Sequence, residues 1–344
     1  MTMDWRELIS SKEIATYIKQ LPLEMLIGEA LFPRKKQMGM DLKYIKGAKK
    51  KPVVLRPSTF DTAVKNRALK ATVDVKTKRM PFFKESVLLN EEERQQLLLA
   101  AQAENKELLL NIISEIYDNY VGLVDGGDSQ MERMRMQALA YGYINIVSDD
   151  SDIVFDFEVP EDHKEVLAGD DVWSNPDADI VGDIERWKTL MRNAGYAVPT
   201  GMVVTSKTFG YLGINNAIKL DIDKDGRIIL TDEIIKNYFK NKLNISIAIV
   251  SGTYKLPDET EEQYYPDNHI TLLPDGNLGS TYYGTTPEEA DKMYGSKLDC
   301  SIVRTGVAVT TMRKEDPVTV ETKVSQLGMP SFERADECFF GTVA

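Results

Sequence analysis

The chain has 344 residues, of which 42% are hydrophobic and 28% charged, and this composition is typical of a folded protein rather than a disordered one. Its net charge of −12 argues against general nucleic-acid binding by the body, and two cysteines are too few for a disulfide framework. The N-terminal residues lack the pattern of a secretory signal, and no stretch approaches the roughly 20 apolar residues that cross a bilayer. These features predict a soluble protein made in a reducing cytosol.

The charge is unevenly distributed along the chain. Residues 34–79 hold 15 Lys and Arg but only three Asp, a net charge of +12, which leaves −24 on the remaining residues. Such a basic segment is attracted either to the acidic body of a neighbouring copy or to a polyanion. The basic residues that would make such contacts are Lys43, Lys46, Lys49, Lys50, Lys51, Arg56, Lys65, Arg67 and Lys70, and they are intersubunit contacts if the partner is a neighbouring copy.

The first 89 residues divide into two parts. Residues 1–33 predict short helical pieces with a small apolar face, broken near Pro22. Residues 34–89 contain short β-type runs at 53–55 and 72–75 within polar sequence, with too few apolar residues for a core of their own. This part therefore predicts an extended hairpin or loop that is held by another molecule.

A long helix is expected next. Asn90 is a favourable N-cap, and three glutamates follow it in the first turn. Apolar residues then recur at three- and four-residue spacing, which predicts a helix to Val124, about 50 Å long. Asp125-Gly126-Gly127 is expected to end that helix, and Asp128 to cap a second one.

The remaining elements predict a β hairpin, an α/β unit and a return to β structure. Residues 144–160 alternate as an antiparallel hairpin around a turn at 148–152. The expected elements after it are a helix at 178–194, a strand at 202–205, a helix from 206, a helix capped by Thr231 that runs to about 243, a strand at 245–250, and β runs at 301–309 and 318–324.

One local pattern is close to a calcium-binding loop. Asp221, Asp223 and Asp225 occupy positions 1, 3 and 5, and Gly226 follows at position 6. Position 12 is Asp232, a shorter ligand than the usual glutamate, and position 9 is an isoleucine. An acidic turn before a capped helix explains the pattern better, and a calcium site is the alternative.

Catalytic motifs are not found. His163 and His269 are isolated and are expected to be solvated loop residues, while Cys300 and Cys338 lie in apolar surroundings and are expected to be buried thiols. The common nucleophile, metal and nucleotide motifs do not occur. The sequence therefore predicts no enzyme activity and no cofactor, and it favours a structural role.

The order of parts and several local stretches resemble the major capsid protein of tailed bacteriophages, specifically the lambda-like E family. The resemblance covers essentially the whole chain. The stretches that carry it are 21–33, 79–85, 90–94, 283–289, 316–318, 321–322 and 330–332.

The resemblance implies an α+β fold of the phage/herpesvirus capsid type. It implies an N-terminal arm (1–33), an extended basic β-hairpin loop (34–89), a peripheral domain with a long spine helix (90–167 and 297–344) and an inserted α/β axial domain (168–296). The basic loop is expected to lie on an adjacent subunit, and this agrees with the charge distribution. Lys65, Lys70 or Lys76 are possible donors for a covalent cross-link, although no motif marks such a site.

The function implied is that of a shell subunit that assembles into hexamers and pentamers of an icosahedral head around phage DNA. Because the folded pattern starts almost at the first residue, we expect a separate scaffolding protein. The other expected partners are a portal, possible decoration proteins and double-stranded DNA held without sequence-specific contact, with no membrane. The protein is expected in the virion head, after assembly in the cytoplasm of the bacterial host.

Three alternatives remain. An encapsulating protein compartment would use the same fold. A calcium-dependent binding protein would use residues 221–232 and would show metal-linked stability. A nucleic-acid-binding protein would use residues 34–79, but only Tyr44 and Phe60 supply aromatic rings there.

Overall fold

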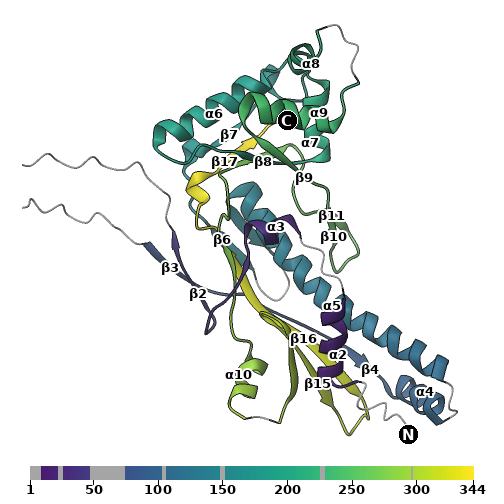
Figure 1. The fold of residues 1–344 in the computed structure, drawn as a ribbon. Coiled ribbons are helices and arrows are strands. Elements are labelled where there is room, and N and C mark those ends of the chain that lie inside the picture. The colour runs from purple at the N-terminus through teal and green to yellow at the C-terminus, as the bar shows by residue number, and fades with distance from the viewer. Residues whose placement is uncertain are drawn as a thin grey trace, which may run out of the picture. The chain divides into compact units, whose positions relative to one another are not determined.

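The structure is a computed structural model, and it describes residues 9–21, 26–46, 74–102, 106–147, 152–224, 229–295 and 297–344. The chain forms two compact units, each made of several segments (Figure 1). Unit 1 consists of Met1–Lys43, Thr77–Arg135 and Ser280–Ser331, and unit 2 of Tyr44–Lys76, Met136–Gly279 and Phe332–Ala344.

Unit 1 is built on a six-stranded sheet in the order β1-β13-β16-β15-β14, with β4 also paired to β16. Only β1 and β13 run parallel, and the other neighbours are antiparallel. The strands are β1 (Arg34–Lys36), β4 (Phe82–Leu89), β13 (Ser280–Tyr283), β14 (Asp299–Arg304), β15 (Val307–Arg313) and β16 (Val320–Ser331). The twelve residues of β16 pair first with β4 and then with β13 along one edge, and with β15 along the other.

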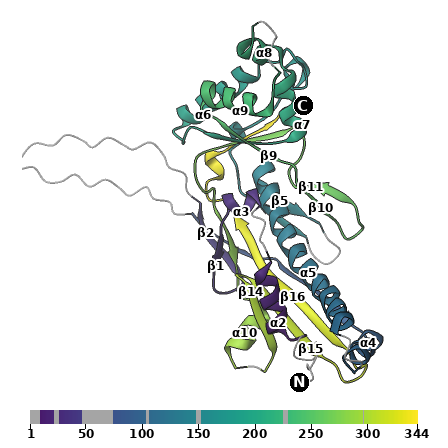
Figure 2. The same ribbon diagram turned by 45° about the vertical axis from the view of Figure 1, so that its right-hand side comes forward.

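Among the described residues, helices pack on this sheet through two apolar clusters, and the larger one is formed by two helices and three strands. Helix α2 (Ser11–Gln20) contributes Ile14 and Ile18, and helix α5 (Lys106–Tyr141) contributes Tyr120 and Val124. Valines of β14, β15 and β16 complete the cluster, and Figure 2 shows α2 beside these strands. The Ser10 side chain accepts a hydrogen bond from the amide of Glu13 and so caps α2.

The glycine pair at 126–127 does not end the long helix, and this expectation was wrong. Helix α5 runs across this pair without a break, and its 36 residues span about 54 Å at 1.5 Å per residue. A Cβ on Gly127 would lie 2.4 Å from the Gln326 side-chain oxygen, whereas a Cβ on Gly126 would meet nothing within 4 Å. The role of Gly127 is therefore to let β16 approach the helix closely, and not to end the helix as a C-cap residue.

The predicted helix start at residue 90 is confirmed. Helix α4 (Glu91–Gln102) begins with a capping box, in which the Asn90 side chain accepts from the Glu93 amide at 2.9 Å and the Glu93 carboxylate accepts from the Asn90 amide at 3.0 Å. The described part of α4 ends at Gln102 and α5 begins at Lys106, so the expected single helix is described as two.

Unit 2 contains a five-stranded sheet in the order β7-β17-β12-β8-β9. The pairs β17–β7 and β8–β9 are parallel, and β12 is antiparallel to both of its neighbours. The strands are β7 (Lys164–Val166), β8 (Gly201–Thr205), β9 (Ser246–Val250), β12 (His269–Leu273) and β17 (Phe339–Thr342), and the helices are α6 (Ile180–Ala194), α7 (Ser206–Ile214), α8 (Asn216–Ile222) and α9 (Asp232–Leu243).

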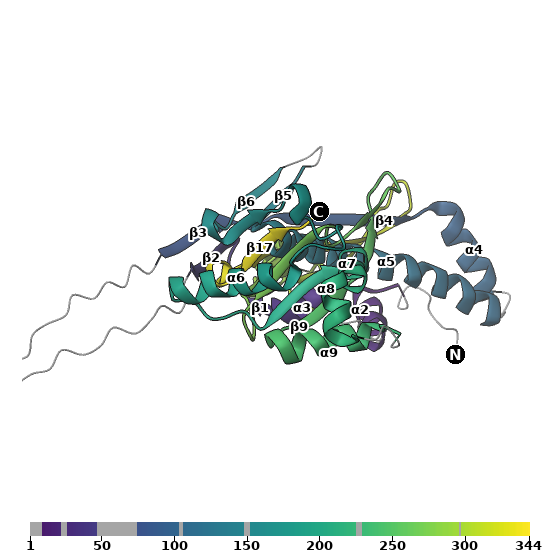
Figure 3. The same ribbon diagram turned by 90° about the horizontal axis from the view of Figure 1, so that it is seen from above.

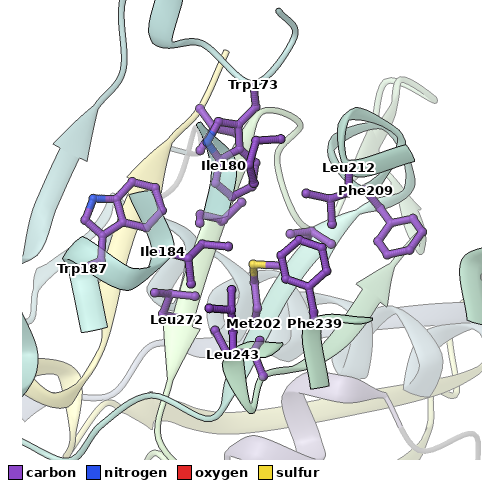
Figure 4. Close-up of a cluster of buried hydrophobic side chains, with 14 of the residues drawn as sticks. Trp173, Ile180, Ile184, Trp187, Met202, Phe209, Leu212, Phe239, Leu243 and Leu272 are labelled. Atoms are coloured by element: carbon purple, nitrogen blue, oxygen red, sulfur yellow. The ribbon is translucent and has the colours of Figure 1, made fainter. Parts of the chain in front are cut away.

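Two tryptophans lie among mostly aliphatic side chains in the core of unit 2 (Figure 4). The Trp187 ring lies 6.0 Å from that of Trp173 and 5.0 Å from that of Phe339, with both pairs stacked. The indole N–H of Trp173 donates to Asp183, and that of Trp187 donates to Glu165. Each buried indole thus has an acceptor, as buried tryptophans require.

The α/β elements predicted between 178 and 250 are confirmed, including the Thr231 cap of α9. The β run expected at 301–309 is two strands, because Gly306 turns the chain between β14 and β15 with a φ of +80°. A left-handed φ is accessible to glycine without strain.

Smaller elements complete the fold. Two-stranded sheets are formed by β2 (Asp41–Lys46) with β3 (Asp74–Arg79), β5 (Tyr143–Ile146) with β6 (Ile153–Asp156), and β10 (Thr253–Lys255) with β11 (Glu261–Gln263), and the first two are visible in Figure 3. The remaining helices are α3 (Ile27–Leu31) and α10 (Pro287–Met293), with short 3-10 turns at Glu161–His163, Gly169–Asp171 and Ala335–Glu337. The β5–β6 pairing confirms the predicted hairpin, although turn residues 148–151 lie outside the described residues. In the described part of the chain, no helix has the length and apolar character needed to cross a membrane.

Candidate assembly site at the root of the basic segment

The basic segment leaves unit 1 and returns to it at one place. Strand β2 follows Met40 and strand β3 precedes Met80, and the Met80 amide donates to the Met40 carbonyl at 2.9 Å. One residue earlier, the Gly39 carbonyl accepts from the Thr285 amide at 3.1 Å. Residues 41–79 are therefore an excursion whose two ends are tied to each other and to the chain that follows β13.

We call the place where the segment leaves and returns its root, and the close approach of two backbone segments fixes it. A Cβ on Gly284 would lie 2.5 Å from the Gly39 carbonyl oxygen, so only glycine fits there. The Gln37 side chain donates to the Asp41 carbonyl at 3.1 Å and accepts from the Lys43 amide at 3.4 Å. These bonds set the direction in which the first residues of β2 leave the sheet.

Arg34, in β1, joins this root to the long helix. Its guanidinium donates to Glu29 of α3 at 2.6 and 3.1 Å and to Asp128 of α5 at 3.1 Å. Arg304 of β14 pairs with the other oxygen of Asp128. One carboxylate on α5 thus binds two arginines from two strands, so the segment before β2 is held by charge-assisted hydrogen bonds.

These interactions set the protonation states. Burial alone lowers the pKa of Arg34, but Glu29, Tyr283 and Asp128 raise it above its ordinary value. Burial raises the pKa of Glu29, and the bond from Arg34 outweighs this, so the pKa of that carboxyl lies below its usual range. Both groups remain charged at neutral pH.

A second ion pair lies one helical turn away and is almost fully buried. Arg135 donates to Glu132 at 3.1 Å, with side chains only 1% and 2% exposed. Arg135 also donates to the hydroxyls of Thr281 at 2.9 Å and Tyr283 at 3.3 Å, and Glu132 accepts from the Gly28 amide at 2.7 Å. The pair therefore connects α5 with both α3 and β13.

Burial dominates the ionisation of Glu132. Its pKa is raised because burial penalises the carboxylate more than Arg135 and the Gly28 amide stabilise it. A Cβ on Gly28 would meet the Glu132 carboxylate at 2.6 Å, so glycine at this position lets the helix approach. The Glu132–Arg135 ion pair is thus tightly enclosed, and removing either side chain would leave the other charge buried without its partner.

Two further ion pairs hold α10 against the sheet. Lys36 of β1 pairs with Glu289 at 2.5 Å, and Lys323 of β16 pairs with Glu288, which also accepts from Ser325 at 3.0 Å. Burial raises the pKa of Glu288, but the bonds from Lys323 and Ser325 lower it below its usual value. The root of the basic segment is therefore fixed by several paired charges.

Few of the basic residues expected to make intersubunit contacts fall in the described chain. Lys43 lies in β2 and is exposed, and Lys46 ends the same strand. The others lie outside the described residues, as does the β run at 53–55: Lys49, Lys50, Lys51, Arg56, Lys65, Arg67 and Lys70.

The residues of the calcium-like pattern belong to two helices and the chain between them. Asp221 lies in α8, where its carboxylate accepts from Tyr238 at 2.7 Å and pairs with Lys242. Asp223 caps the end of α8 and Asp232 begins α9, while Asp225 lies outside the described residues. In the described part of the chain, no three His, Cys, Asp or Glu side chains are grouped to hold a metal ion.

The expectation of solvated histidines was wrong. His163 is 1% exposed and packs edge-on against Tyr196 at 5.0 Å, and burial lowers its pKa. His269 begins β12 and is partly buried, with Nδ1 2.9 Å from the Asp267 carbonyl oxygen. Cys300 and Cys338 are free and buried, as predicted.

Sequence reasoning missed the charged cluster on α5. Asp128, Glu132 and Arg135 occur at four- and three-residue spacing, and so share one helix face with buried Met131. Charged residues at helical spacing inside an apolar stretch were the available signal. Asp128 was instead expected to cap a second helix, because the glycine pair suggested a break, and no role was predicted for Glu132 or Arg135.

Comparison with known proteins gives one family. The model of the family "Phage major capsid protein E" matches residues 10–343. No curated protein sequence matches the chain. Among solved structures, a prophage protein of E. coli CFT073 described as a capsid protein is similar with a TM-score of 0.63 at 12% identity, over 98% of this chain and 99% of that one. A phage-related protein of Bordetella bronchiseptica RB50 is similar with a TM-score of 0.54 at 12% identity, over 97% and 96% of the two chains.

Proposed function

The chain belongs to the phage major capsid protein E family and is a subunit of a capsid shell, and we propose that it is joined to its neighbours by the basic excursion 41–79. The match of the family model to residues 10–343 supports the capsid role, and the solved structures support the capsid fold. The proposal concerns how this chain makes the contacts from which a shell is built.

The observation that carries the proposal is an excursion of 39 residues with both ends tied at Met40 and Met80. It holds twelve Lys and Arg and three Asp, a net charge of +9, whereas the chain as a whole is acidic. Ordering a residue costs about 1–2 kcal/mol of conformational entropy, and this segment has few apolar side chains to offset it. An acidic neighbouring copy supplies the missing contacts.

This arrangement gives a head-to-tail interface. The excursion of one copy meets a different surface of the next copy, so the contact is heterologous and closes into rings when the rotation allows it. Hexamers and pentamers of a shell are rings of this kind.

The domain roles belong to the same proposal. We assign unit 1 to the peripheral domain, with α5 as its spine, and unit 2 to the axial domain. The division of the chain supports two domains. Residues 136–167 and 332–344 fall in unit 2 rather than with the spine, and residues 280–296 fall in unit 1 rather than with the axial domain. The part of 34–89 that serves as the intersubunit loop is narrowed to 41–79, because β1 and β4 belong to the sheet.

Further partners are proposed from the family and from charge. Residues outside 34–79 carry −24, so double-stranded DNA inside the shell would be held without tight or sequence-specific contact. A separate scaffolding protein, a portal and decoration proteins complete the proposed set. Assembly would take place in the bacterial cytoplasm before the protein resides in the virion head, and the subunit would act without catalysis.

The test is deletion of residues 47–73, with a short Gly-Ser linker joining β2 to β3. We expect the variant to remain folded and to form no shells by negative-stain electron microscopy and sedimentation. A second variant keeps the length and replaces Lys49, Lys50, Lys51, Arg56, Lys65, Arg67 and Lys70 by Gln. Near-ultraviolet circular dichroism of the stacked tryptophans verifies folding of unit 2 in both variants. Shells formed by the deletion variant as readily as by the parent chain would contradict the proposal.

A further inference from the structure

The β5–β6 hairpin of unit 2 has one buried and one exposed face. Ile144, Ile146 and Phe155 point inward and are 7% exposed or less. The other face carries Val147 and Val154, which are 72% and 57% exposed, together with Tyr143 at 42%. These three exposed apolar side chains on one hairpin face form a candidate interaction surface.

Acidic residues surround this face. Asp152 precedes β6, Asp156 ends it opposite Tyr143, and Glu158 follows, and all three are exposed. Within the described part of the chain, neither Asp152 nor Asp156 forms an ion pair, and the only polar contact of the Asp156 side chain is with the Glu158 amide at 2.7 Å. The surrounding sequence, residues 136–163, contains seven Asp and Glu and no Lys or Arg.

We propose that the outer face of the β5–β6 hairpin receives the basic excursion of a neighbouring copy. This inference rests on the proposed function and assigns the surface that the excursion binds. The hairpin face is defined by the described residues Tyr143, Val147, Asp152, Val154 and Asp156.

The sequence of the excursion fits such a face. Residues 47–73 hold seven Lys and Arg and one Asp, so their charge is opposite to that around the hairpin. They also include apolar residues between the basic ones, among them Val53, Leu55 and Phe60, which match the apolar centre. Cationic side chains at the rim and apolar ones at the centre correspond to the usual anatomy of a protein interface.

Charge also argues against two other occupants. A nucleic acid is repelled by the exposed carboxylates of Asp152 and Asp156, which form no ion pair within the described part of the chain. A second copy of the same hairpin brings like charges together, which disfavours a symmetric hairpin–hairpin contact. The basic excursion is the occupant that gains from both the apolar centre and the acidic rim.

The direct test places a photo-crosslinker on this face in the full-length chain. Val147→p-benzoylphenylalanine is introduced, and shells are assembled from an equal mixture of ¹⁴N- and ¹⁵N-labelled protein. After irradiation, mass spectrometry identifies the cross-linked peptides. The expected products join the peptide of residue 147 to peptides from 41–79, with mixed isotopes that show two different copies. Products within one copy, or with any other segment, would overturn the inference.

A charge-reversal pair tests the energetics. Asp152→Lys combined with Asp156→Lys is compared with Glu107→Lys combined with Glu115→Lys on the exposed face of α5, which changes the chain's charge by the same amount. An exposed ion pair is worth roughly 1.5- to 5-fold in binding, and reversal adds repulsion, so we expect the hairpin variant to need at least about tenfold more protein to assemble. The α5 variant should assemble near the parent concentration. Equal behaviour of the two variants would refute the role of the hairpin.

The outcomes separate this inference from the proposed function. If deleting 47–73 abolishes shells but the cross-links and charge reversals do not implicate the hairpin, the excursion binds another surface and only the present inference falls. If the deletion leaves shells intact, the proposed function fails, and the inference fails with it.

Discussion

Removal of the Arg135 side-chain charge should destabilise unit 1 strongly. Arg135→Met keeps most of the apolar stem but leaves the Glu132 carboxylate, 2% exposed, without its cation. Breaking a buried ion pair from one side costs about 3–5 kcal/mol, because an uncompensated charge remains. Glu132→Gln combined with Arg135→Met leaves no charge, and the Gln oxygen can still accept from the Gly28 amide. We expect this double variant to recover at least about 2 kcal/mol.

The loss of unfolding free energy in Arg135→Met should also depend on pH. Burial already raises the pKa of Glu132, and the loss of Arg135 raises it further above its value in the unfolded chain. A carboxyl group whose pKa is higher in the folded than in the unfolded chain favours folding at a pH below its unfolded-state pKa. That contribution is lost as the pH rises through its folded-state pKa. The difference between parent and Arg135→Met should therefore be larger at pH 8 than at pH 5.

The assay is hydrogen exchange of α5 peptides at constant pH, together with urea unfolding at pH 5 and pH 8 followed by far-ultraviolet circular dichroism. Tryptophan fluorescence would report largely on the other unit, because two of the three tryptophans, Trp173 and Trp187, lie in unit 2. A loss of 3 kcal/mol corresponds to about 150-fold faster exchange. A loss below about 1 kcal/mol, a pH-independent loss, or a double variant less stable than the single one would refute the reasoning.

Three further predictions concern unit 1. Gly126→Ala should stabilise α5 by about 0.5–1 kcal/mol, whereas Gly127→Ala should give no gain, because its Cβ meets a buried glutamine of β16. Thermal unfolding of the two variants compares them directly. Equal gains in stability would contradict the close approach of β16 to Gly127. Asn90→Ala should cost about 1 kcal/mol in urea unfolding through loss of the α4 cap, and an unchanged midpoint would mean that the capping box contributes nothing. Lys323→Met should raise the low pKa of Glu288. Because a lowered carboxyl pKa stabilises the folded state above the unfolded-state pKa, the loss of stability in this variant should be largest near pH 7 and should diminish as the pH falls through the lowered pKa of Glu288. A loss of stability that does not change with pH would show that the ion pair is not its cause.

The elements that were predictable from the sequence depend on local rules. The capping box at Asn90, the Thr231 cap of α9 and the alternation of β5 and β6 are all encoded within a few residues. These features were predicted correctly because each local signal agrees with the tertiary structure. The family resemblance added the capsid fold class, which periodicity alone does not give.

The failures have tertiary causes. Gly127 looks like a helix end, yet the reason for a glycine there is the close approach of Gln326 in β16, more than 190 residues later in the sequence. His163 lies in an acidic stretch typical of a loop, but it is buried against Tyr196 from a distant segment. The ion pairs of Arg34 depend on contacts between α3, β1, β14 and α5, and no local pattern encodes which carboxylate each arginine will meet.

The pairing of β4 with β16 has a mechanical consequence. Tension applied to the excursion at Arg79 passes through Met80 and Pro81 into β4, parallel to the strand axis. The eight registered residue pairs between β4 and β16 are then loaded together in shear, instead of one after another as in peeling. Because β16 is also held by β15 along its opposite edge, the load spreads into the sheet of unit 1. If the excursion joins neighbouring subunits as proposed, a shell under internal pressure would meet its tensile resistance in this sheet, and the excursion would be a tether anchored along the whole of β4.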